Sequence, residues 1–189
     1  MKAFMAAASA AVVVCAIPAI AAAQDTTTRP TGLYANLGYA NTNTEDVNLG
    51  AIGARLGYRF NDWLGVEGEL AGGVKSDDVS VPSAFVVPGG PTSVSIKLKH
   101  EEAIYGVGFL PVGTNFDLLA RVGYGNTSIK GSAGGFSASQ DGRSWNFGAG
   151  AQYHWDGANG VRADYTRQEF TGDGSGHADV WSIAFSHRF

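Results

Sequence analysis

The chain has 189 residues, of which 44% are hydrophobic and 16% charged, with a formal net charge of -4 and a pI near 5.5. The length suits one domain, and the acidic balance argues against the cationic surface by which proteins bind nucleic acid. The one cysteine, Cys15, excludes an intramolecular disulfide and a multi-cysteine metal site.

Residues 1–23 have the pattern of a secretory signal peptide. Lys2 supplies the positive start, residues 10–20 the apolar core, and Ala21-Ala22-Ala23 an A-x-A cleavage site. A retained anchor helix is the alternative, which the proline and small residues of this segment argue against. The mature chain is therefore predicted to start at Gln24, with residues 24–31 as a lead-in. No apolar run near 18 residues follows, so a mature chain that spans a membrane must be a closed barrel.

Three β-strands are predicted before the first long loop, at about residues 32–40, 49–60 and 63–72. The second opposes apolar residues to Arg55 and Arg59, and the third opposes apolar residues to Glu67 and Glu69. A charged face that alternates strictly with an apolar face does not fit an ordinary soluble core.

The fourth strand emerges from residues 75–95, which contain three prolines and are predicted to form an exposed loop with room for hairpin extensions. It ends near residue 110, and its register above Glu102 stays open. Its outward face is predicted to carry Ala103, Tyr105, Val107 and Phe109, which leaves Ile104 and Leu110 pointing inward.

Four more strands are predicted, at residues 116–126, 143–155, 160–169 and 177–189. A glycine- and serine-rich segment, residues 127–142, is predicted to be a second exposed loop. Arg121, Arg162 and Asp164 lie opposite the apolar faces of their strands. Short and long connections alternate along the whole chain.

Two kinds of barrel accommodate such strands. A transmembrane barrel turns its apolar face outward, whereas a soluble barrel turns it inward. Aromatic residues favour the transmembrane barrel because they fall into two belts, as two membrane interfaces require. With both termini periplasmic, the turn-end belt is Phe60, Phe109, Phe116, Tyr153 and Phe189, and the loop-end belt is Tyr39, Tyr124, Trp145 and Trp181.

Four segments carry a resemblance to a known family: GLYANLGY, GARLGYRFNDWLGVEGEL, FDLLARVGYG and the terminal WSIAFSHRF. The chain resembles the small eight-stranded outer-membrane β-barrels of Gram-negative bacteria, the group of OmpA-like transmembrane domains, OmpX-like and opacity-type surface proteins. The resemblance implies an all-β, antiparallel up-and-down transmembrane barrel over residues 32–189, with short periplasmic turns and longer extracellular loops. It also implies a monomer that contacts outer-membrane lipid and lipopolysaccharide. Because the chain ends at Phe189, anchoring through a peptidoglycan-binding domain is not expected.

The closing strand ends on an aromatic residue and resembles the signal that the barrel-assembly machinery reads. That machinery and periplasmic chaperones are therefore expected partners during biogenesis. The residues assigned to the assembly signal are Trp181, Ile183, Phe185 and Phe189.

Inward-facing charges are predicted to pair with one another, because an eight-stranded barrel is about wide enough to be filled by its own side chains and unpaired buried charges are costly. A filled polar lumen is favoured, and a narrow pore gated by switchable ion pairs is the alternative. The predicted lumen network is Arg55, Arg59, Glu67, Glu69, Arg121, Arg162 and Asp164, with Glu102 as a further candidate.

No catalytic residue, cofactor or metal site is predicted. His100, His154, His177 and His187 lack the close partners of a zinc site. Ser186 and His187 point to opposite faces of a strand and no His-x-Ser-Asn pattern occurs, so a lipid-modifying enzyme is a remote alternative. The runs Asp77-Asp78 and Asp173-Gly174-Ser175-Gly176 could bind calcium weakly, although such turn sequences need no metal.

The predicted function is structural or surface-interacting, because binding usually resides in loops held on a rigid scaffold. An extracellular ligand would bind these loops, and the sequence does not name it. A small-solute or ion pore is the alternative.

Overall fold

The computed structural model describes residues 31–44, 48–80, 93–133, 136–171 and 176–189. The predicted signal peptide and all of the predicted lead-in except Thr31 lie outside these residues. So do residues 81–92 of the first predicted loop and residues 173–175 of a calcium candidate. Among the described residues, no helix is long and apolar enough to cross a membrane.

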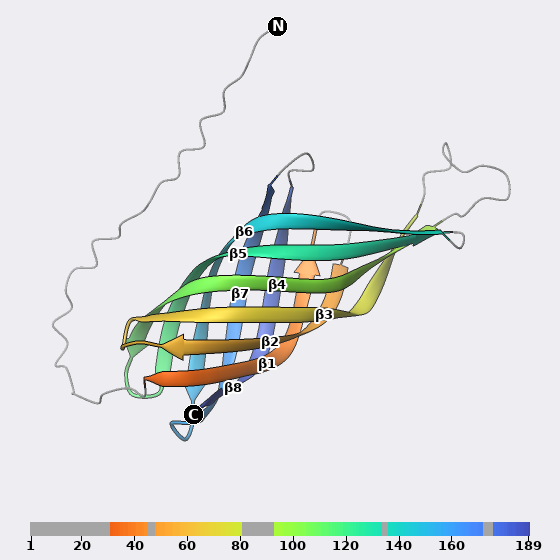
Figure 1. Ribbon diagram of the computed structural model, residues 1–189. Coiled ribbons are helices and arrows are strands. Elements are labelled where there is room, and N and C mark those ends of the chain that lie inside the picture. Colours follow the sequence, from red (N-terminus) through yellow and green to blue (C-terminus); the bar gives the residue numbers. More distant parts are fainter. Residues whose placement is uncertain (1–30, 45–47, 81–92, 134–135, 172–175) are drawn as a thin grey trace, which may run out of the picture.

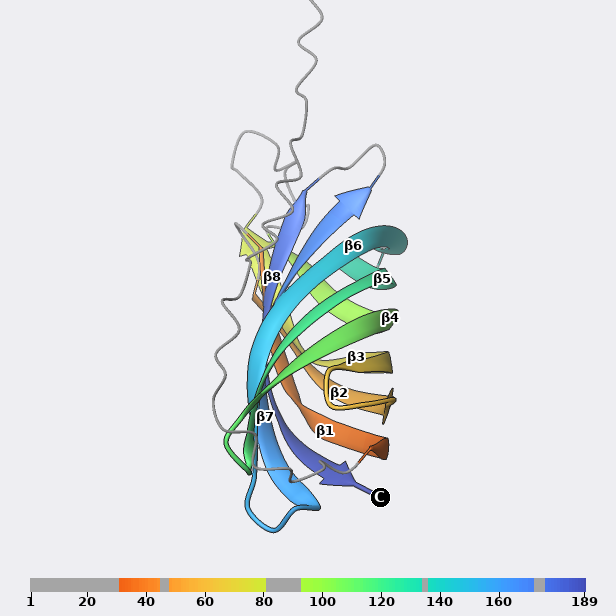
Figure 2. The ribbon, with the colours of Figure 1, turned by 90° about the vertical axis from the view of Figure 1, so that its left-hand side faces the viewer.

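Eight antiparallel strands close into a barrel in sequence order, with the first strand paired to the last. The C-terminus lies at the same end as the short turns (Figure 1), and the strands wrap around the barrel at a tilt (Figure 2). The predicted eight-stranded up-and-down fold is confirmed. The strands are β1 (Gly32–Asn43), β2 (Asn48–Arg59), β3 (Leu64–Ser80), β4 (Ser93–Val112), β5 (Phe116–Ala133), β6 (Phe136–His154), β7 (Asn159–Thr171) and β8 (His177–Arg188).

The two-residue period of the sequence becomes the two faces of the barrel wall. Along β5, every second residue from Asp117 to Gly125 is buried, whereas Leu118 and Val122 are 42% and 48% exposed. Large apolar side chains on the other strands are exposed in the same way. An apolar exterior around a polar interior is the arrangement of a transmembrane barrel and the reverse of a soluble one.

Aromatic side chains gather at both ends of this apolar band. Two belts of this kind mark two membrane–water interfaces. At the turn end, the ring centroids of Tyr58 and Phe60 are 5.5 Å apart, and those of Trp155 and Phe185 are 6.1 Å apart. At the other end, the ring centroids of Tyr124 and Trp145 are 5.3 Å apart, and those of Tyr165 and Trp181 are 4.8 Å apart.

The predicted orientation of β4 is wrong. Tyr105 and Val107 stand directly opposite Glu67 and Arg121, and directly opposed residues on antiparallel strands point to the same face. Tyr105, Val107 and Phe109 are therefore inside the barrel, at 4% exposure or less, with Ala103 packed beside them. Ile104 and Leu110 point outward. Both faces of β4 are apolar, so hydrophobicity does not distinguish them.

The two hairpins formed by β3 with β4 and by β5 with β6 extend far beyond the other strands (Figure 1). Their strands have 17 to 20 residues, against 12 or 13 in β1, β2, β7 and β8. Pairing continues to Ser80 with Ser93, and to Ala133 with Phe136. The exposed loop predicted at residues 127–142 is shorter than expected, because residues 127–133 pair with residues 136–142 across the hairpin despite a composition of low β-propensity.

Side-chain hydrogen bonds shape the short turns. Asn61 Oδ1 accepts the backbone N–H groups of Trp63 and Leu64. Asp156 accepts the side-chain amide of Asn159, and the backbone N–H groups of Asn159 and Ala158, which hold the pKa of Asp156 below its usual value. These turns place the strand ends of one rim at fixed positions.

Candidate functional site

Six ionic side chains meet in the lumen from β2, β3, β5 and β7. All six are at most 8% exposed, and three guanidinium groups face three carboxylates, so their charges balance. We call this set the charge ring. It consists of Arg55, Glu67, Glu69, Arg121, Arg162 and Asp164.

Each arginine of the charge ring bridges two carboxylates. Arg55 contacts Glu69 through Nε at 2.5 Å and Asp164 through Nη1 at 2.6 Å. Arg162 contacts Asp164 through Nε at 2.9 Å and Glu67 through both terminal nitrogens. Arg121 Nη1 lies 2.7 Å from Glu69 and 3.8 Å from Glu67, which closes a cycle of alternating charges.

Neutral groups occupy the remaining hydrogen-bonding positions around the charge ring. The Tyr34 hydroxyl donates to Glu67 at 2.8 Å, and Arg55 Nη2 donates to the Ser182 hydroxyl at 2.9 Å. Arg121 donates twice to Thr166 Oγ1. Buried charges are tolerated only when they are paired and hydrogen-bonded in this way, so the ring is a packed structural element that crosses the lumen.

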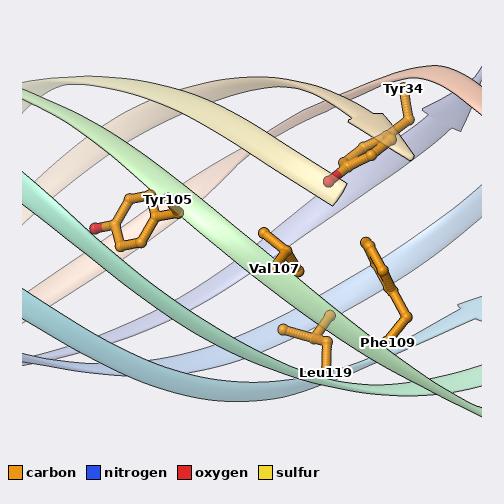
Figure 3. Close-up of a cluster of buried hydrophobic side chains, with 5 residues drawn as sticks. All are labelled: Tyr34, Tyr105, Val107, Phe109 and Leu119. Atoms are coloured by element: carbon orange, nitrogen blue, oxygen red, sulfur yellow. The ribbon is translucent and has the colours of Figure 1, made fainter. Parts of the chain in front are cut away.

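Apolar side chains from β1, β4 and β5 fill the lumen beside the charge ring. They are Tyr34, Tyr105, Val107, Phe109 and Leu119, which form one buried cluster inside the barrel (Figure 3). The Tyr105 ring lies 4.2 Å from the guanidinium carbon of Arg121, within cation–π range. An aromatic face of β4 thus packs against a guanidinium group of the charge ring.

A second charged cluster lies toward the turn end of the lumen. Asp117 accepts hydrogen bonds from Arg59 at 3.1 Å, from Arg188 at 2.9 Å and from Gln152 at 2.9 Å. Arg59 therefore belongs to this cluster rather than to the charge ring. Asp117 and Arg188 are absent from the predicted lumen network, although Asp117 lies on the same face of β5 as Arg121 and the alternation along that strand predicts its inward position.

At the outer end, the inward carboxylate of β4 is Glu101, not Glu102. Glu101 is 5% exposed and accepts a hydrogen bond of 2.5 Å from Gln168 on β7. Glu102 is exposed on the outer face. The candidacy of Glu102 for the lumen network is wrong for the same reason as the orientation of β4.

One serine–histidine contact occurs in the lumen. Ser186 Oγ lies 3.4 Å from His154 Nε2, and both residues are 1% exposed. His154 Nδ1 has no hydrogen-bond partner among the described residues, so no third group orients the imidazole as in a catalytic triad. The neighbouring cavity that Ser186 lines holds about 10 Å³, the space of roughly one water molecule. The alternation along single strands does not predict this contact, because β6 and β8 are not neighbours in the sheet.

Within the described ranges, no group of three or more His, Cys, Asp or Glu side chains is placed to hold a metal ion.

The residues assigned to the assembly signal lie on the outer face of β8 and at the chain end. Trp181, Ile183, Phe185 and Phe189 are 50% to 71% exposed. The backbone N–H of Phe189 donates to the carbonyl of Leu33, which ties the chain end to β1. Recognition of these residues by the assembly machinery stays a prediction.

A closed barrel with an apolar outer band, two aromatic belts and a charged interior defines the class of transmembrane β-barrels. The chain belongs to the family of the outer membrane protein beta-barrel domain, whose sequence model matches residues 7–189. Its location is the outer membrane of a Gram-negative bacterium.

Solved structures share this fold. Ail of Yersinia pestis, crystallised in complex with the heparin analogue sucrose octasulfate, has a TM-score of 0.58 and 20% identity, covering 85% of this chain and 100% of its own. Neisserial surface protein A has a TM-score of 0.58 and 11% identity over 83% and 96% of the two chains. OprG of Pseudomonas aeruginosa has a TM-score of 0.54 and 17% identity over 86% and 98%. No curated protein matches the sequence.

Proposed function

We propose that this protein is a non-conducting outer-membrane barrel that acts through its two long outer hairpins. The observation that carries the proposal is the charge ring. Its six side chains are almost completely buried, and every arginine bridges two carboxylates. An ion that crossed the lumen would have to break several of these charge-assisted hydrogen bonds.

The hairpins support a role in surface contact. Their strand pairing extends well past the aromatic belt of Tyr124 and Trp145, with a register shift between Ala71 and Ser76 in β3, so they stand on the barrel outside the membrane. Binding sites are commonly built on segments that a rigid scaffold positions. Ail has been crystallised with a heparin analogue, which makes a sulfated glycan a suitable first probe for these hairpins.

Conductance across a planar bilayer tests the closed lumen. We expect the refolded protein to produce no stable open channel. The matched variant Arg121→Ala removes one bridging guanidinium and should produce leak events if the ring is the barrier. A stable, large conductance of the unmodified protein would contradict the proposal.

Shortening the hairpins tests the surface role. Ser76 and Lys97 are partners in the register, so an Asn-Gly turn can join them in place of residues 77–96. Thr127 and Gly142 can be joined in the same way. We expect both shortened barrels to fold. Cells that carry either shortened barrel should adhere less to a glycan-coated surface than cells that carry the unmodified protein. Unchanged adhesion in the two variants would count against the hairpins.

A small-solute pore is the second candidate. Two water-sized cavities favour it, one of about 10 Å³ beside Arg59 and one of about 20 Å³ beside Glu101. They lie toward opposite ends of the lumen with the charge ring between them. Opening a continuous path would require the ring itself to rearrange.

Three further expectations belong to this proposal. The protein acts without catalysis, since the buried Ser186–His154 contact has no orienting group among the described residues and the cavity beside it has no room for a substrate. It functions as a monomer in contact with lipid and lipopolysaccharide. The barrel-assembly machinery and periplasmic chaperones bind it during biogenesis.

A further inference from the structure

A small cavity lies inside the lumen between the charge ring and the outer end of the barrel. It holds about 20 Å³, which is room for roughly one water-sized ion or molecule. Glu101 on β4 and Asn36 on β1 line it, together with Arg55 and Glu69 of the charge ring. The cavity therefore adjoins a carboxylate that the charge ring does not include.

Glu101 is a buried carboxylate without a cationic partner among the described residues. It is 5% exposed and accepts a hydrogen bond from the neutral amide of Gln168. No lysine, arginine or histidine in the described part of the chain forms an ion pair with it. Taking an ionised carboxylate out of water without a partner is strongly unfavourable, so this group requires a compensating charge.

The charged side chains nearest to Glu101 compensate one another. Glu69 is shared by Arg55 at 2.5 Å and Arg121 at 2.7 Å, and the three arginines of the charge ring face three carboxylates. The cluster around Asp117 lies on the far side of the charge ring, toward the turn end. Glu101 thus gives the outer part of the lumen one negative charge in excess.

An apolar cluster lies on the outer side of Glu101. Leu49, Ala51 and Leu98 are at most 6% exposed and pack together, and Ala51 also lines the cavity. This cluster separates the carboxylate from bulk water. The basic residues of β3 to β6 near this end are exposed instead of facing the cavity: Lys75, Lys97, Lys99, His100, Lys130 and Arg143.

Two buried amide groups beside Glu101 have unsatisfied oxygens. Asn36 is 3% exposed, and neither its Oδ1 nor its Nδ2 has a hydrogen-bond partner among the described residues. Gln168 is 1% exposed, and its Nε2 donates to Glu101 at 2.5 Å while its Oε1 is likewise unpaired within the described ranges. Buried polar atoms are nearly always satisfied, so these oxygens point to a bound group. Carboxylate and amide oxygens are ligands of hard cations.

We propose that the cavity binds one monovalent cation of about the size of Na⁺, coordinated by the Glu101 carboxylate and Asn36 Oδ1. Gln168 fixes the carboxylate through its amide N–H. The single excess charge favours a monovalent ion, because a divalent ion would leave a positive charge beside Arg55. A cation held here is compatible with a lumen that does not conduct, and the site does not depend on what the outer hairpins bind.

Urea unfolding of the refolded barrel in uncharged lipid tests the site, with Na⁺ as the probe. N-methylglucamine, a cation too large for the cavity, replaces Na⁺ at constant ionic strength. Above the Kd, each tenfold rise in Na⁺ should raise the folding equilibrium constant of the unmodified protein about tenfold. We expect Glu101→Gln to lose this dependence. The matched control is Glu102→Gln, which removes the neighbouring carboxylate on the exposed face and should keep it.

Two further measurements separate a cation site from a merely structural role. Asn36→Leu removes the amide ligand and keeps the charge, so it should shift the onset of the dependence to higher Na⁺. The infrared difference spectrum between the unmodified protein and Glu101→Gln, recorded in Na⁺ at neutral pH, should show the carboxylate band of Glu101.

A carbonyl band of a protonated acid at Glu101 would overturn the proposal, because a proton would then neutralise the group in place of Na⁺. Equal dependence on Na⁺ in Glu101→Gln and the unmodified protein would also overturn it, since the ion would then act elsewhere on the barrel.

Discussion

At the level of single residues, the lumen is a set of charges whose partners come from strands distant in sequence. Arg162 and Glu67 are 95 residues apart, and Arg55 and Asp164 are 109 apart. Each residue of the charge ring is held by groups on at least one other strand. Removing one carboxylate therefore leaves three buried guanidinium groups facing two carboxylates, with one positive charge in excess.

Glu67→Gln should destabilise the barrel by about 3–5 kcal/mol, because Arg162 and Arg121 lose a shared carboxylate in a buried site. Urea unfolding of the refolded protein in lipid measures the change. The control is Glu169→Gln, which removes the exposed pair with Arg167 and should cost about 1 kcal/mol or less. Equal effects of the two variants would show that the ring is not a structural unit.

The cost in stability of an arginine on the outer face should depend on how deep in the membrane the arginine lies. Ala120 lies midway along the outer face of β5 between Phe116 and Tyr124, so Ala120→Arg should cost about 2–4 kcal/mol. Asn126→Arg, beyond the aromatic belt, should cost about 0–1 kcal/mol. The same unfolding measurement compares them, and a reversed order would mean that the apolar band is misplaced.

At the level of elements, strands differ in what determines their orientation. In β2, β3 and β7, charged residues on one face identify the lumen side. In β4, both faces are apolar over residues 103–110. Pairing with the inward residues of β3 and β5 determines which face points into the lumen. The closing strand differs again, because at its exposed aromatic end the backbone N–H of Phe189 donates to the carbonyl of Leu33 on β1.

Phe189→Asp should lower outer-membrane yield in cells more than it lowers the stability of barrel refolded in vitro. The Phe189 ring is 71% exposed and the N–H of residue 189 is kept, so the direct loss of stability is small. Phe60→Asp is the control, because Phe60 is a turn-end aromatic with 59% exposure away from the terminus. Normal yield of Phe189→Asp together with a large loss of stability would make Phe189 a structural residue and not a signal.

At the level of the whole molecule, closure matters most. Pairing of β1 with β8 leaves no free sheet edge, so every strand is hydrogen-bonded on both sides within the lipid. The closed barrel is a rigid cylinder that supports the two long hairpins and holds the side chains of the filled lumen in place. Detergent alone should not open such a structure.

The protein extracted from outer membranes should therefore be heat-modifiable on gels. Samples kept cold in detergent should migrate differently from boiled samples, because boiling is needed to separate β1 from β8. Identical mobility of the two samples would contradict a closed barrel.

The sequence by itself determined the number of strands, the closed transmembrane class and the orientation of strands that carry charges on one face. A two-residue period places Arg55 and Glu67 on the strand face opposite the leucines. This fixes which face of each strand turns toward the lumen, since charges that face lipid are costly. Only the tertiary structure decided the face of β4, the partners within the charge ring and the length of the outer hairpins. These depend on register between strands and on side chains meeting across the lumen, and neither is encoded in the alternation along one strand.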